Sequence, residues 1–262
     1  MDLLSFDAKK GKRVGPVVLT RDDMIEALQG HLVEAFLVGG AVNVSEESFA
    51  TILYEIAGFG QFLDDIRDET IPASQKCFGS EEEARKWTEK SPEVRILMLL
   101  PEEVVFLAVE WEVLEVKQGK RLLGKDELWE TMSNLHGSKF FQSYCVYRHL
   151  KENKWCVRSG LMFGCDYLIY CLGPQYYHSS AGVSVCNTIN SLQLLTLTRI
   201  LSHNKKSLIL ASCQPPEVVD RCLKYEDTKQ ALVEIVTLKT YFLERNVSRI
   251  SNSPNELYEL NL

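Results

Sequence analysis

Apolar and polar positions repeat with the strand period in some segments of the chain and with the helix period in others, which predicts strands mixed with helices. Short apolar runs predict strands at residues 15–20, 95–100, 167–170, 181–189, 206–213 and 231–243. Apolar faces at helical spacing predict helices at residues 101–116, 125–135, 138–153 and 191–202. Two further strand-like runs flank Gly39-Gly40. Strands and helices therefore alternate along most of the chain.

Two helix starts near the N-terminus carry capping signals. Thr20 can cap a helix that has Asp23 at its third position, the spacing of a capping box. Ser45 can cap an amphipathic helix that ends near Gly58. Both signals indicate helices placed between strands.

This alternation predicts an α/β or α+β fold with a mixed sheet. We predict a small N-terminal α/β domain over residues 14–98. A C-terminal domain over residues 99–247 would hold a mixed central sheet flanked by helices, and residues 1–13 and 248–262 would be tails.

Composition narrows the class of protein. The 262 residues are 45% hydrophobic and 25% charged, as in ordinary globular proteins. No apolar run reaches the roughly 18 residues of a membrane-spanning helix, so none is expected. The net charge of −7 argues against general nucleic-acid binding. It does not exclude an RNA substrate, because the local field at the site decides.

The eight cysteines predict neither a zinc site nor a disulfide framework, because no C-x-x-C pair is present. Free thiols favour an intracellular, reducing compartment. No other metal-ligand spacing stands out, so we expect no metal ion and no other cofactor.

The segment at residues 144–178, YCVYRHLKENKWCVRSGLMFGCDYLIYCLGPQYYH, carries a series of motifs. A glycine-bracketed turn leads into a strand that ends in Tyr170, and a Gly-Pro turn then leads to His178. Lys206 opens a later K-x-L-x-L strand. In this order the motifs resemble the catalytic domain of the tRNA-splicing (tRNA-intron) endonucleases. The resemblance covers about residues 99–245.

Two further features refine this resemblance. Residues 35–62 look similar to the N-terminal domain of the same family. The short spacing from Tyr170 to His178 resembles that of the eukaryotic subunit type, often called subunit two, that cuts the 5′ splice site. Lys205 adjoins Lys206, so two lysines are candidates, and the phase of the leucines that follow favours Lys206.

The resemblance implies RNA cleavage in which a 2′-hydroxyl attacks its own phosphate, leaving a 2′,3′-cyclic phosphate and a 5′-hydroxyl. It assigns Tyr170 as general base, His178 as general acid and Lys206 as electrostatic stabiliser. Histidine suits an acid because its pKa of about 6.5 keeps part of it protonated, whereas tyrosine, at about 10, needs a nearby cation. The tethered nucleophile requires no metal.

The resemblance also implies RNA contacts and a docking loop. Arg199 matches an arginine that grips RNA in the family, with Tyr241 as the accompanying aromatic. A surface arginine and a core tyrosine are the alternative interpretation. The acidic loop within residues 214–230 resembles one that docks into a partner subunit, although a solvated loop would need no such explanation.

The resemblance therefore implies a catalytic subunit that cleaves precursor tRNA at the 5′ splice site. Its partners would be the other subunits of a heterotetramer, one catalytic and two structural. The protein would be nuclear, or else held by partners at the cytoplasmic face of an organelle membrane. The alternative function is a non-catalytic structural subunit of the same complex, and the intact Tyr170, His178 and Lys206 favour the catalytic one.

Overall fold

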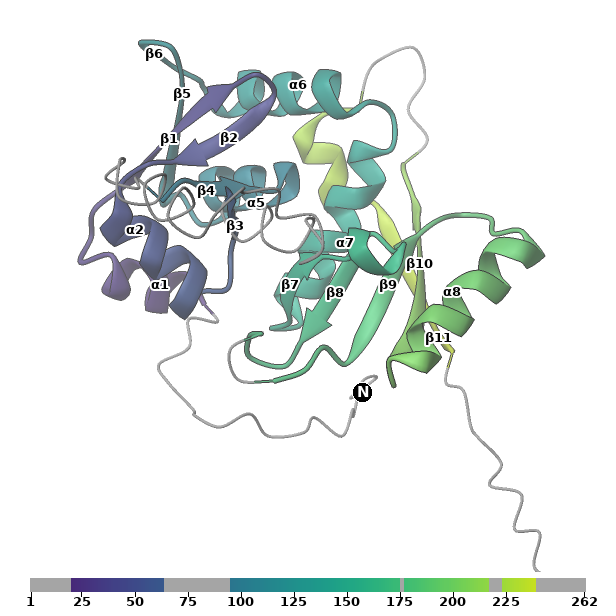
Figure 1. The fold of residues 1–262 in the computed structure, drawn as a ribbon. Coiled ribbons are helices and arrows are strands. Elements are labelled where there is room, and N and C mark those ends of the chain that lie inside the picture. Colours follow the sequence, from purple (N-terminus) through teal and green to yellow (C-terminus); the bar gives the residue numbers. More distant parts are fainter. Residues whose placement is uncertain (1–19, 64–94, 175–176, 217–222, 239–262) are drawn as a thin grey trace, which may run out of the picture.

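The computed structural model describes residues 20–63, 95–174, 177–216 and 223–238 (Figure 1). A first sheet has the strand order β3-β4-β2-β1-β5-β6. Its strands are β1 (Val33–Val38), β2 (Ala41–Val44), β3 (Gln61–Phe62), β4 (Leu97–Leu99), β5 (Leu114–Gln118) and β6 (Arg121–Leu122). A second sheet has the order β11-β10-β9-β8-β7. Its strands are β7 (Cys156–Ser159), β8 (Tyr167–Tyr170), β9 (Ala181–Val185), β10 (Ser207–Gln214) and β11 (Leu232–Leu238).

Helices cover both sheets. They are α1 (Arg21–Ala27), α2 (Glu47–Thr51) with the π-helix η1 (Ile52–Ile56), α5 (Pro101–Val105) with the π-helix η3 (Phe106–Glu110), α6 (Lys125–His136), α7 (Phe140–Glu152) and α8 (Ser191–His203). Short 3-10 turns form η4 (Leu161–Phe163) and η5 (Tyr225–Lys229). Helices α7 and α8 pack on opposite faces of the second sheet (Figure 1). The predicted mixed α/β fold is confirmed. Within the described ranges, no helix is long and apolar enough to cross a membrane.

One large core joins the two sheets, and a smaller one lies under α8. Buried side chains of the first sheet, α5, α6, α7 and one face of the second sheet form a single apolar cluster. The other face of the second sheet packs Leu168 and Leu208 against Leu197 and Leu201 of α8. Alternation along the strands explains the division, because successive side chains point to opposite faces.

The local structures predicted near the N-terminus are confirmed in part. Thr20 caps α1 with the capping box completed by Asp23, as predicted. The strands around Gly39-Gly40 form the antiparallel hairpin β1–β2. The helix predicted to end near Gly58 is confirmed as α2 with η1, but Ser45 does not cap it, because α2 starts at Glu47 after the cap residue Glu46. Strand β2 pairs as far as Val44, so the chain first has to leave the sheet.

The predicted helix at residues 101–116 is also wrong in its second half. The helix ends at Glu110, and Glu112 adopts a left-handed conformation with φ of 55°. The chain then enters β5, which pairs in parallel with β1. The predicted domain boundary after residue 98 therefore falls inside the span of the first sheet, which continues to β6.

Several predicted segments lie outside the described residues. They are residues 15–19 of the first predicted strand, both tails, the part of the acidic loop at residues 217–222 and the end of the last strand after Leu238. The helices predicted at 125–135, 138–153 and 191–202 are confirmed as α6, α7 and α8. The strands predicted at residues 167–170 and 181–189 are confirmed as β8 and β9, and the two pair antiparallel.

Candidate active site

Three neighbouring strands of the second sheet share one end. Strand β9 runs antiparallel to β8 and parallel to β10, so the last residue of β8 lies beside the first residues of β9 and β10. Tyr170 is that last residue, His178 comes shortly before β9, and Lys206 directly precedes β10. The topology thus brings all three predicted residues to the same end of these three strands.

Tyr170 is half-buried on the face of the sheet that α8 covers. It packs against the small apolar cluster under α8, on the same side as Leu168. Its backbone is held from the other side by the pairing with Cys156 of β7. Strand β8 lies in the interior of the sheet and is therefore a rigid support, which fixes the tyrosine ring at the end of the strand.

His178 is exposed, but the backbone around it is held. The Tyr177 N–H donates to the Gly173 carbonyl at 3.0 Å, directly before the histidine. The Ser180 N–H donates to the Ile169 carbonyl at 2.8 Å, which starts the pairing with β8. The imidazole is therefore presented to solvent from a segment anchored at both ends.

Lys206 is half-buried and lies at the same strand ends, directly before β10. Its Nζ donates to the Ser179 carbonyl at 3.5 Å and lies 5.4 Å from the centre of the Phe163 ring. Partial burial lowers the pKa of Lys206 from its ordinary value. The contact with Ser179 places the ammonium beside the residue that follows His178. Phe163 lies within the motif segment at residues 144–178, but its contact with the lysine was not predicted.

The end of α8 decides how the two neighbouring lysines are presented. The Lys206 N–H bonds the Leu201 carbonyl at 2.8 Å, and the Lys205 N–H bonds the Ser202 carbonyl at 2.9 Å. This is the double hydrogen bond of a Schellman motif, with Lys205 at the left-handed position, φ 56°. Lys205 is exposed, whereas Lys206 is directed onto the sheet. The geometry favours Lys206 as the site lysine.

Replacing Lys205 by glycine should stabilise the protein. A non-glycine residue in the left-handed region costs about 1 kcal/mol, which glycine avoids. We expect Lys205→Gly to raise Tm by roughly 2–4 °C in a thermal melt. Lys205→Ala is the matched control, because it removes the same side chain and keeps the strain. Equal Tm values for the two variants would contradict this account.

The other predicted site residues receive a mixed outcome. Arg199 is exposed on α8, while Tyr241 lies outside the described residues, so their pairing stays a prediction. In the acidic loop, Asp227 is buried and accepts the Lys224 N–H at 2.7 Å. That carboxylate caps η5, so it acts within its own loop.

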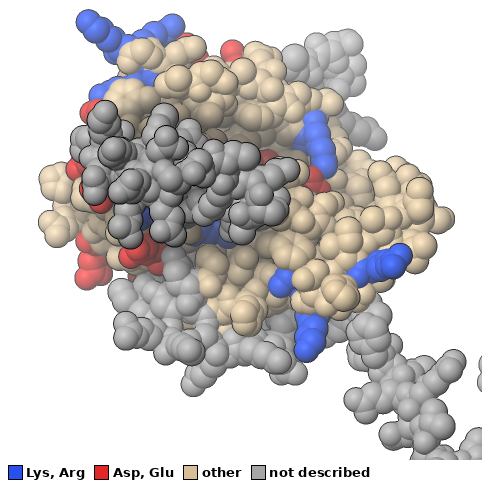
Figure 2. Space-filling model, in the orientation of Figure 1, with Lys and Arg blue, Asp and Glu red and all other residues tan. Residues whose placement is uncertain are grey.

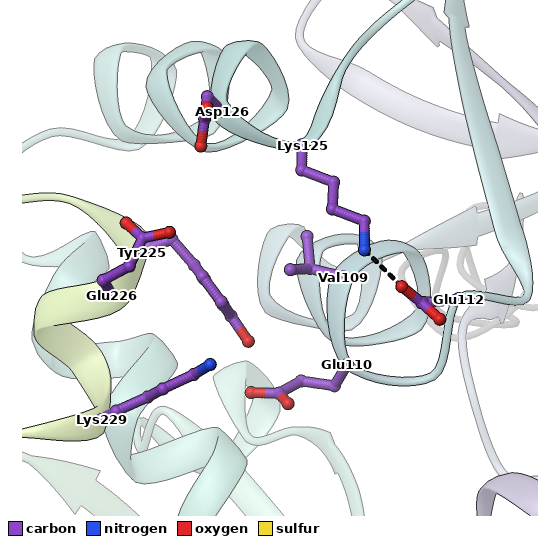
Figure 3. A pocket seen from close by; sticks show the side chains of 8 residues that line it. All are labelled: Val109, Glu110, Glu112, Lys125, Asp126, Tyr225, Glu226 and Lys229. Atoms are coloured by element: carbon purple, nitrogen blue, oxygen red, sulfur yellow. Dashed lines mark hydrogen bonds and ion pairs between the residues drawn. The ribbon is translucent and has the colours of Figure 1, made fainter.

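The pockets lie away from this edge. The one in Figure 3 has a volume of about 440 Å³ and lies between η3, α6 and η5. Its side chains are mostly charged, and Lys125 pairs there with Glu112 (Figure 3). A second, of about 620 Å³, lies between η4, the end of β9 and the first turns of α8. Neither pocket includes Tyr170, His178 or Lys206. At these strand ends His178 is exposed, whereas Tyr170 and Lys206 are half-buried.

Surface charge does not mark a binding face by itself. On the face shown in Figure 2, the lysines and arginines form small groups at the upper left and the lower right, and no continuous basic surface of described residues joins them. Over the stretches that the structure describes, no group of three His, Cys, Asp or Glu side chains could hold a metal ion. The candidate site is therefore identified by the topology of the second sheet and by the contacts of Lys206.

Comparison with known proteins gives one consistent result. The family model for the tRNA intron endonuclease N-terminal domain matches residues 33–129, and that for the catalytic C-terminal domain matches residues 140–220. Together the two models match more than half of the chain. The match to the catalytic domain includes Tyr170, His178 and Lys206.

Individual relatives agree with this result. The tRNA-splicing endonuclease subunit SEN2 of Saccharomyces cerevisiae is 39% identical over 118 residues, which is 44% of this chain and 30% of that protein. SEN2 of Eremothecium gossypii is 31% identical over 121 residues, or 44% of this chain and 33% of that protein. The chain thus spans about a third of the length of these two relatives.

An archaeal relative is matched over more of its length. The tRNA-splicing endonuclease of Saccharolobus islandicus is 27% identical over 183 residues, which is 69% of this chain and 90% of that protein. Both domain matches and these relatives point the same way, and the chain belongs to the tRNA intron endonuclease family.

Proposed function

We propose that this chain is a catalytic subunit of a tRNA-splicing endonuclease and cuts precursor tRNA at the 5′ splice site. The observation that carries this proposal is the meeting of Tyr170, His178 and Lys206 at one end of three adjacent strands. The choice of the 5′ splice site rests on the short spacing from Tyr170 to His178.

The reaction would proceed by general acid–base catalysis. Tyr170, in its phenolate form, takes the proton of the 2′-hydroxyl as the 2′-oxygen bonds to phosphorus. His178 gives a proton to the 5′-oxygen as its bond to phosphorus breaks. The products carry a 2′,3′-cyclic phosphate and a 5′-hydroxyl, and the proton count balances.

Lys206 would stabilise the phosphorane, which carries more negative charge than the substrate. An ammonium held partly out of water interacts more strongly with such charge than one in bulk solvent. The Ser179 carbonyl and the Phe163 ring hold Lys206 in place before the substrate arrives. A fixed cation needs little reorganisation in the transition state.

We also propose that the chain works in a heteromeric assembly, as the subunit names of its relatives suggest. Strand β11 lies at the edge of the second sheet and exposes Leu232 and Val236. An apolar edge strand is prone to pair with another chain. The nuclear localisation stays a prediction.

The alternative function is a non-catalytic structural subunit of the same assembly. Such a subunit would need the fold but not the three reactive side chains. Tyr170 and Lys206 are both partly buried and held by neighbours at the shared strand ends. This arrangement favours the catalytic role.

The test is cleavage of precursor tRNA by the chain purified with the subunits that associate with it. Lys206→Ala should lower the 5′ cut by about 10²-fold, because one preorganised charge is lost. Lys205→Ala is the matched control and should cut normally. The buffer contains a chelator, with a polyamine to keep the RNA folded, and product ends are analysed for the cyclic phosphate. Full cleavage by Lys206→Ala would contradict the proposal.

A further inference from the structure

The Phe163 ring is the aromatic neighbour of the Lys206 ammonium. The ammonium lies 5.4 Å from the ring centre, within the range of a cation–π interaction. The ring itself is half-buried and packs against the apolar cluster under α8. The Ser179 carbonyl holds the same ammonium from another direction. Two fixed groups from different parts of the chain thus converge on one cation.

The turn that carries Phe163 is built for this presentation. The Phe163 N–H bonds the Gly160 carbonyl at 2.9 Å and closes the single turn of η4. A Cβ atom on Gly160 would lie 2.6 Å from the Cys165 sulfur, so a side chain there would displace the turn. Gly164 ends the turn with φ of 72°, which favours glycine.

The residues inside the turn differ sharply in exposure. Leu161 is 80% exposed and Met162 is 67% exposed, whereas Phe163 packs inward. The turn therefore directs only one of its three side chains under the lysine. Gly160 and Gly164 flank this turn in the sequence, and the structure gives a physical reason for both: they allow the turn to place the Phe163 ring.

We propose that Phe163 is a positioning residue for Lys206, and this inference rests on the proposed function. The lysine side chain has four flexible carbons, and its charge stabilises the phosphorane only when it is held near the scissile phosphate. The negative face of the ring attracts the ammonium and restricts its position. Phe163 does not touch the reacting atoms and acts through the lysine.

The test is a double-mutant cycle in the assembled complex, with kcat and KM measured for the 5′ cut. Phe163→Leu should lower kcat about tenfold and leave KM unchanged, whereas Phe163→Tyr, which keeps a ring, should restore most of the rate. In a Lys206→Ala background, Phe163→Leu should cause no further loss, because its effect runs through the lysine. A purely structural role would give additive losses in the double variant.

A second replacement guards against misfolding. Pentafluorophenylalanine at position 163 keeps the shape of the ring and removes its negative face, so it should reduce kcat as Phe163→Leu does. Leu194→Ala, which removes packing from the same apolar cluster, is the control and should lower Tm without a selective loss of kcat. Normal kcat with the fluorinated ring would overturn the proposal.

The results separate this proposal from the proposed function. If Lys206→Ala is impaired and Phe163→Leu is not, only the positioning role fails. If Lys206→Ala cuts normally, the proposed function fails and the positioning role with it.

Discussion

Replacing His178 by alanine should lower cleavage at the 5′ splice site by about 10² to 10⁴-fold and leave the 3′ cut unchanged. The variant loses one positioned proton transfer to the departing 5′-oxygen. The fold should be unaffected, because His178 is exposed and its neighbours are held by backbone hydrogen bonds. The precursor would accumulate as the 5′ exon still joined to its intron, resolved on a denaturing gel.

His31→Ala is the matched control for this experiment. His31 is also exposed, and it lies beside the first sheet, far along the chain from the candidate site. The control should cut both sites at the normal rate. Equal loss at both sites in His178→Ala would refute the assignment to the 5′ cut. Normal cleavage at both would refute His178 as the acid.

The second large effect concerns a buried polar cluster between the two sheets. Glu103 of α5 is 1% exposed, and its Oε2 accepts the Gly60 N–H at 3.0 Å. Arg158 of β7 donates to the Gly60 carbonyl, and Lys151 of α7 lies with its Nζ 4.0 Å from the centre of the Phe59 ring. Charges from both halves of the chain therefore meet in one interior site.

Glu103→Ala should lower the free energy of unfolding by about 3–5 kcal/mol, measured by urea denaturation. The change leaves the Gly60 N–H and the Leu100 N–H without the Glu103 acceptor. It also removes a carboxylate near Lys151, which is buried, and Arg158, which is half-buried. Glu103→Gln is the matched control, because its amide oxygen can still accept those hydrogen bonds, and it should cost less. Equal losses in the two variants would show that packing, rather than polar contacts, gives Glu103 its importance.

The same residue should make stability depend on pH. Burial raises the pKa of Glu103 from 4.5 to about 7, although the Arg158 charge acts in the opposite direction. The folded state thus binds this proton more tightly than the unfolded state. The resulting stability is fully present below pH 4.5 and is lost as the pH rises through 7. Relative to Glu103→Gln, which does not titrate, the wild type should lose stability between pH 5 and 7.5.

Lys151 acts in a higher range and in the opposite sense. Burial lowers the pKa of Lys151 from 10.5 to about 8, so the folded state releases this proton more readily than the unfolded state. Its contribution to stability therefore rises between pH 8 and 10.5. The comparison with Glu103→Gln stays below pH 8 in order to separate the two groups.

Local features of the fold were determined by the sequence itself. Thr20 and Asp23 lie three residues apart and need only each other to cap α1. The helices α6, α7 and α8 follow their apolar periodicity, and the turn at Gly39-Gly40 closes the hairpin β1–β2. In each case the interacting groups are close along the chain, so the pattern carries the information.

Features that depend on partners far along the chain were decided only in the tertiary structure. Residues 111–116 keep an apolar spacing that suits a helix, yet pairing with β1 makes Leu114–Gln118 a strand. Strand β2 likewise extends to Val44 because it pairs with β4, and this delays the helix predicted from Ser45. Long-range pairing outweighs local propensity at these places.

The candidate site shows the same division. The resemblance carried by the sequence motifs assigned Tyr170, His178 and Lys206 to the site. Only the parallel pairing of β9 with β10 brings Lys206 to the end of β8. Only the helix end at Lys205 distinguishes the two lysines, and only packing places the Phe163 ring beside the chosen one. A sequence states which groups are present, whereas the distances between them are set by strand order and by the packing of side chains that are remote along the chain.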